Sequence, residues 1–237
     1  MARSMKVVTV KCACCGNKQT IEKVEYTPSQ DSELHLMEYM DFKYIPCNVC
    51  SNCGYVSKNI DLLLGAKTRQ IVASEVYKRI HDYGFIEGYK DLGYNEYLET
   101  NIGDLDAMEL LYEAEGKSNL TFARLNSRIA EIKTSLRGEY TENMYQLDDD
   151  DPEFKLYSKL ISNLTEQIDD ATKKCYETLI KLDLKGPYEI LFAAEVLTRV
   201  NAYAKARKLV SNLKKNYTFD GELNRYVNNF LTEVEVI

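Results

Sequence analysis

The chain has 237 residues, enough for one large domain or two modest ones. Its net charge of −7 argues against a nucleic-acid partner, because proteins that bind nucleic acids gain much of their affinity by neutralising phosphates. Its longest apolar runs are far shorter than the roughly 20 residues that cross a membrane, which argues against a membrane protein.

Cysteine usage and the first residues indicate the compartment. The opening MARSMKVVTV has no apolar segment long enough for a secretory signal. Most of the seven cysteines are clustered at metal-ligand spacing, which in a chain without such a signal favours reduced ligands over disulfides. We therefore expect a cytoplasmic protein.

The first 60 residues are predicted to form two β-hairpins, each with a cysteine turn at its tip. Stretches rich in β-branched residues at 6–10 and 19–26 flank the first turn, and stretches at 42–49 and 55–60 flank the second. The HLMEYM segment between the hairpins is compatible with either a helix or a strand.

The pattern changes after residue 60, where apolar residues recur every three or four positions, as in amphipathic helices. We predict helices at 66–83, 87–99, 104–115, 119–138, 152–182, 187–200, 203–216 and 220–233. The predicted fold is mostly α, with a small β zinc ribbon at residues 1–60 followed by an all-helical, tetratricopeptide-like antiparallel domain at residues 61–237.

Aspartates at three positions are predicted to begin helices. Asp104, Asp151 and Asp220 each precede an amphipathic segment, and Pro152 suits the first helical position. The run DDDDPEF around Asp151 lacks the central glycine and the distal glutamate of a calcium loop. We therefore interpret it as a helix start and not as a cation site.

Two Cys-x-x-Cys-Gly units predict a tetrahedral metal site. The glycine allows a left-handed backbone that turns main-chain N–H groups toward sulfur, so it identifies the ligand pairs. Gly16 follows the first pair and Gly54 follows the second. The predicted metal ligands are Cys12, Cys15, Cys50 and Cys53.

Zinc is the expected metal, and iron in the same all-sulfur cage is the alternative. Four thiolates close the coordination sphere, which indicates a structural site and not a catalytic one. The segment between Cys15 and Cys50 is longer than in most such sites, so an insert at about 27–43 must leave the ribbon and return. His35 in this insert could replace one cysteine as a ligand, but we favour the interpretation that it is simply exposed to solvent.

Three cysteines remain outside this set. Cys14 and Cys47 lie next to predicted ligands and are either small apolar residues or spare thiols with redox chemistry. Cys47 also has Cys-x-x-Cys spacing with Cys50, but no glycine follows Cys50. Cys175 falls on the apolar face of a predicted helix and is expected in the core.

No catalytic constellation is visible. The two histidines have no accompanying nucleophile and acid pattern, and no complete phosphate-binding glycine loop occurs. We therefore expect a protein that is not an enzyme. The 18 tyrosines pack in the core or line a groove for a peptide, since tyrosine is enriched at interfaces.

The stretch RVNAYAKARKLVSNL resembles the turn and second helix of a tetratricopeptide repeat. Asn201 stands at the turn, Tyr203 opens the second helix, and Ala206 takes the small position where paired helices touch. Ala194 and Leu197 suit the first helix of the pair. No second clean repeat is visible, so the resemblance implies a short or irregular array.

The motifs VKCACCGNKQTIEKV and CNVCSNCGYVSKN, followed by these helices, resemble a bacterial family of unknown function. In that family a zinc-ribbon-like region with CxxCG and VCxxCGY motifs precedes a helical region. The matching residues are Cys12, Cys15, Gly16, Val49, Cys50, Cys53, Gly54 and Tyr55. The resemblance implies metal binding without known enzyme activity.

Three functions remain open at this point. The first is an adaptor whose helical domain binds a protein or peptide, or a second copy of the chain. The second is a redox or electron-transfer protein that uses iron or the spare thiols. The third is a nucleic-acid-binding ribbon, favoured only by the basic extreme N-terminus.

Overall fold

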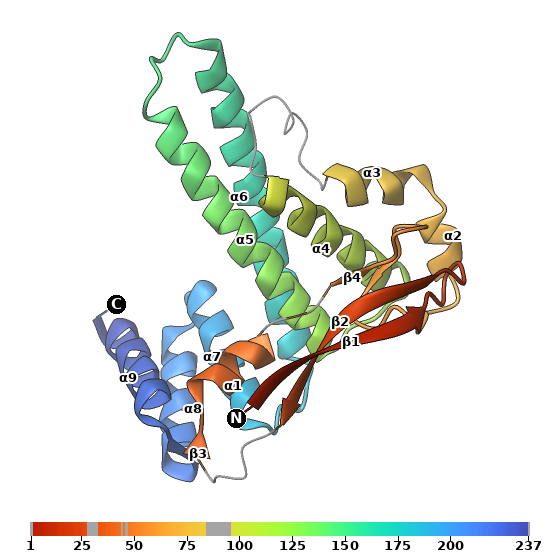
Figure 1. Cartoon of the computed structure of the whole chain (residues 1–237). Helices are drawn as coiled ribbons and strands as arrows, with labels where there is room; N and C mark the ends of the chain where they lie inside the picture. The colour runs from red at the N-terminus through yellow and green to blue at the C-terminus, as the bar shows by residue number, and fades with distance from the viewer. Residues whose placement is uncertain (1, 28–32, 44, 46, 84–95, 237) are drawn as a thin grey trace.

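The computed structural model describes residues 2–27, 33–43, 45, 47–83 and 96–236 (Figure 1). It is mostly helical, and most of its strands lie near the N-terminus. The strands are β1 (Ala2–Lys11), β2 (Lys18–Thr27), β3 (Glu33–Leu34), β4 (Asn48–Val49), β5 (Val56–Ser57) and β6 (Thr218–Phe219). The helices are α1 (Leu36–Lys43), α2 (Thr68–Val72), α3 (Glu75–Tyr83), α4 (Glu96–Ala114), α5 (Leu120–Met144), α6 (Pro152–Leu179), α7 (Pro187–Arg199), α8 (Tyr203–Asn216) and α9 (Gly221–Val236).

The two predicted hairpins are present. Strands β1 and β2 pair antiparallel over their full length, and the short strands β4 and β5 form the second pair. The predicted strand at 42–49 is wrong at its start, because α1 extends to Lys43. A helix places Tyr39 and Phe42 on one face, where Tyr39 is fully buried and the Phe42 ring lies 6.1 Å from that of Phe192 in α7.

The predicted helix at 66–83 is two helices, α2 and α3. Ser74 separates them: its hydroxyl donates to the Ile71 carbonyl and accepts from the Tyr77 amide. A serine that bonds both neighbouring turns ends one helix and caps the next. The break changes the direction of the chain beside the cysteine turns, as Figure 1 shows.

The prediction that a helix begins at Asp104 is wrong. Helix α4 begins at Glu96, and Asp104 lies within it with a largely buried side chain beside His81 of α3. The predicted helix at 87–99 falls mostly outside the described residues. The helix end at Gly116 is confirmed, since this glycine has a φ of +62°.

The longest elements are α5 and α6, which pack as an antiparallel hairpin (Figure 1). Helix α5 continues past Gly138, where the prediction ended it, because one glycine costs only about 1 kcal/mol in a long packed helix. The cap at Asp151 is confirmed by a 2.8 Å bond from the Glu153 amide. Among the helices of the described ranges, none is both long and apolar enough to span a bilayer.

The buried residues form two clusters. The first joins the cysteine turns and β5 to α2–α6, with Val10, Tyr55 and Met108 among its members. The second joins α1 to α7, α8 and α9, with Tyr39 and Phe192 among its members. The division into domains at 1–60 and 61–237 and the tetratricopeptide-like arrangement stay predictions.

Candidate metal centre

The sulfur atoms of Cys12, Cys15, Cys50 and Cys53 lie within 4.8 Å of one another. The Sγ atoms of Cys12 and Cys53 are 3.9 Å apart, and those of Cys15 and Cys50 are 3.6 Å apart. A tetrahedral zinc ion with bonds of about 2.3 Å to each sulfur requires sulfur–sulfur separations of about 3.8 Å. The four predicted residues therefore converge into a group that could hold a metal ion.

The first cysteine turn closes the β1–β2 hairpin. The Cys12 amide donates to the Asn17 carbonyl at 2.8 Å, and the Gly16 amide donates to the Cys12 carbonyl at 2.8 Å. Gly16 has a φ of +81°, which side chains other than glycine rarely adopt. The left-handed backbone predicted at this glycine is confirmed.

The second turn repeats this geometry between β4 and β5. The Cys50 amide donates to the Tyr55 carbonyl, and the Gly54 amide donates to the Cys50 carbonyl, both at 2.9 Å. Gly54 has a φ of +70°. Two hairpins with matching turns thus place one cysteine pair opposite the other.

A tyrosine of α3 supports the second turn from the helical side. The fully buried Tyr77 hydroxyl accepts from the Val56 amide at 3.0 Å and donates to the Gly54 carbonyl at 2.9 Å. It therefore satisfies two main-chain groups next to the Cys53 ligand position. From the sequence, Tyr77 is expected only within the helix at 66–83, and no local pattern indicates this role.

Gln19 joins the two turns. Its side-chain amide donates to the Val49 carbonyl at 2.6 Å, while its oxygen accepts from the Ser51 amide at 2.9 Å. One residue of β2 thus fixes the main chain on both sides of Cys50. Gln19 could not be identified from a local pattern, because its partners lie about thirty positions away along the chain.

Arg69 of α2 fixes the first turn. Its guanidinium donates to the carbonyls of Ala13 and Cys14 at 3.0 and 3.2 Å. The Ala13 amide donates to the Ile60 carbonyl at 2.9 Å. The first turn is therefore attached to the chain that follows the second turn, which limits relative motion of the ligand pairs.

The surroundings shift the pKa of Cys12, Cys15 and Cys53. Burial raises the pKa of Cys12 and of Cys53. The exposed Cys15 differs, since the Asn52 amide donates to its sulfur at 3.5 Å and lowers its pKa to about 6. A metal ion takes thiolates as ligands, so binding here releases protons and is weaker in acid.

The other cysteines lie outside this group. The Cys47 sulfur lies 3.9 Å from that of Met108, and burial raises the pKa of Cys47 to about 12. Burial also raises the pKa of Cys14, and it raises that of the core residue Cys175 to about 12. These environments favour neutral thiols, which are poor nucleophiles.

His35 lies far from the four sulfurs in the fold. Its Nδ1 is 3.0 Å from the Asp220 carboxylate at the start of α9. Its main-chain amide donates to the Tyr188 hydroxyl at 2.9 Å. The possibility that His35 replaces a cysteine ligand is therefore wrong, because the insert that carries it packs against the C-terminal helices.

A cavity of about 700 Å³ lies between the second cysteine turn and helices α2 and α3. The residues that line it include Cys15, Asn52, Arg69, Tyr77 and Lys78.

No family model, curated protein or solved structure matches the chain. The resemblance to a bacterial family of unknown function therefore stays a prediction.

Proposed function

We propose that this chain is a zinc protein whose four-cysteine site is structural and whose helical region is an adaptor surface for another protein or for its own copy. The convergence of four sulfurs within 4.8 Å carries the proposal. Four thiolates fill a tetrahedron and leave no position for a reacting water. The site then stabilises the ribbon, and the chain acts through binding and not through catalysis.

The surroundings of the remaining thiols favour zinc chemistry over redox chemistry. A redox cysteine needs thiolate character and access to solvent, whereas burial raises the pKa of Cys47 to about 12. Iron in the same cage remains the alternative metal. A nucleic-acid-binding ribbon is less favoured, because the whole chain carries a net charge of −7.

Two observations support tetratricopeptide-like packing in the C-terminal helices. Ala194 of α7 and Ala206 of α8 are fully buried in the same cluster, which suits small residues at a close helix contact. Asn201 takes a φ of +59° in the turn between these helices. A compact helix pair of this kind presents its outer faces to partners.

Elemental analysis and absorption spectroscopy test the metal assignment. We expect about one zinc ion per chain and a colourless protein, because zinc has no visible transitions. Visible absorption with stoichiometric iron would exclude the zinc assignment. Thiol titration of the same sample should leave Cys14 and Cys47 unreactive.

Affinity capture with the metal-loaded chain, compared with a chelated sample, tests the adaptor role.

A further inference from the structure

Helix α8 is basic in an acidic protein. Residues 200–219 contain no aspartate or glutamate, whereas the whole chain has a net charge of −7. The basic residues of this segment are all exposed: Lys205, Arg207, Lys208, Lys214 and Lys215. Such a concentration of one charge sign attracts a segment of the opposite sign.

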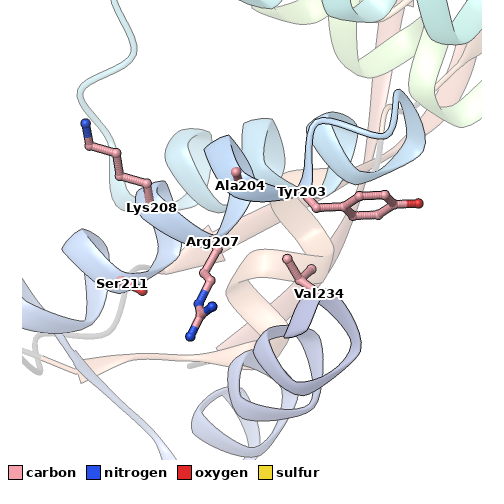
Figure 2. A pocket seen from close by; sticks show the side chains of 6 residues that line it. All are labelled: Tyr203, Ala204, Arg207, Lys208, Ser211 and Val234. Atoms are coloured by element: carbon pink, nitrogen blue, oxygen red, sulfur yellow. The ribbon is translucent and has the colours of Figure 1, made fainter. Parts of the chain in front are cut away.

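A groove lies along this helix where it meets the end of α9 (Figure 2). Its volume is about 430 Å³. Tyr203 and Val234 line one part, and Arg207 and Lys208 of α8 are further lining residues whose side chains leave the helix in different directions, as Figure 2 shows. Lys215 stands two turns beyond Lys208 and continues the charged face. The groove therefore combines an apolar part with a cationic part.

The complementary feature is the loop that joins α5 to α6. It contains the run Asp148, Asp149, Asp150 and Asp151. Tyr145 precedes the run and is 79% exposed. This acidic tip, defined as residues 145–151, has an aromatic side chain to place against Tyr203 and Val234 and carboxylates to pair with Lys208 and Lys215.

The groove and the acidic tip lie at opposite ends of one molecule (Figure 1). Helix α6 alone has 28 residues, which corresponds to about 42 Å. A chain cannot bring its own tip to its own groove. Two copies aligned antiparallel can place each tip on the groove of the other, which closes the assembly as a two-fold dimer.

We propose that the acidic tip of one copy binds the α8–α9 groove of a second copy, giving an antiparallel dimer. This inference rests on the proposed interaction role of the helical region and names the chain itself as the partner. The contact is mainly electrostatic, so salt weakens it: the screening length falls from about 10 Å at 0.1 M salt to about 3 Å at 1 M.

Sedimentation velocity on three full-length forms tests this proposal. One variant reverses the charge of the groove face (Lys208→Glu with Lys215→Glu), and another reverses the tip (Asp149→Lys with Asp150→Lys). We expect the unmodified chain to dimerise at low salt and each variant to dimerise at least about tenfold more weakly. An equimolar mixture of the two variants should associate again, because each groove then meets a tip of opposite charge.

The control is Lys117→Glu with Lys181→Glu, which makes the same charge change at exposed lysines away from α8 and should leave dimerisation intact. A monomer at all salt concentrations would overturn the proposal, as would variants that fail to rescue each other. Binding of anionic vesicles or duplex DNA that Lys208→Glu abolishes in a monomeric chain would also overturn it. Zinc content and affinity capture are read separately, so a monomer that retains zinc and captures another protein contradicts this inference alone.

Discussion

Asp104 is a buried acidic side chain at the contact between α3 and α4. Its carboxylate lies 3.4 Å from the His81 imidazole, and its side chain is 12% exposed. Burial raises the pKa of Asp104 to about 6, although the nearby His81 opposes the rise. The ordinary pKa of aspartate is about 3.9. Asp104 therefore keeps its proton up to a higher pH in the folded state than in the unfolded state.

Asp104→Asn should therefore stabilise the protein at neutral pH. The ionised carboxylate destabilises the fold fully above about pH 6 and not at all below about pH 4, because the folded pKa lies above the unfolded one. After allowance for solvent screening we expect a gain of about 1–2 kcal/mol in the free energy of unfolding at pH 7. Urea unfolding at several pH values measures it, and a gain that does not shrink toward acid contradicts the account.

At the residue scale, the sequence identified the four cysteines that converge but not the residues that hold them. The cysteine spacing and the two glycines act within one turn, so a local pattern reveals them. Gln19, Arg69 and Tyr77 contact the turns from strands and helices far away along the chain. Only the folded arrangement brings these residues to the site.

Glycine at position 103 allows α3 and α4 to approach closely. A Cβ atom there would lie 2.3 Å from the backbone oxygen of His81, a contact that the backbone cannot accept without shifting. Gly138 in α5 is the opposite case, since nothing lies within 4 Å of the corresponding position. A substitution at Gly103 therefore reports on helix packing, whereas one at Gly138 reports on helix propensity.

We expect Gly103→Ala to destabilise the protein by about 1–3 kcal/mol, because overpacking forces the two helices apart. The matched control Gly138→Ala should stabilise it by up to about 1 kcal/mol, since alanine is the better helix former. Thermal or urea unfolding followed by circular dichroism measures both changes. Equal effects of the two substitutions would show that α3 does not pack closely on α4.

At the element scale, periodicity located the long helices well and their ends less well. Proline and capping aspartate act locally, so the start of α6 at Pro152 was predictable. The break at Ser74 and the early start of α4 depend on what the helices pack against. The helix over Leu36–Lys43 was undecided from sequence because its apolar face is defined by α7 and α9.

At the scale of the whole molecule, the metal centre is continuous with the first core. Cys12 and Cys50 are almost completely buried and belong to the cluster that contains Met108 and Leu125. A metal ion on these sulfurs would therefore stabilise the ribbon and the helices packed on it together. The insert that carries α1 contacts the second cluster. The first 60 residues therefore contribute side chains to both hydrophobic clusters.

Metal content of two serine variants tests the central claim most directly. In Cys50→Ser the site loses one of its four sulfurs, and we expect zinc to fall well below one ion per chain. In Cys47→Ser the changed residue lies against Met108 and outside the group of four, so we expect about one zinc ion, as in the unmodified chain. Zinc lost from Cys47→Ser but retained by Cys50→Ser would contradict the account.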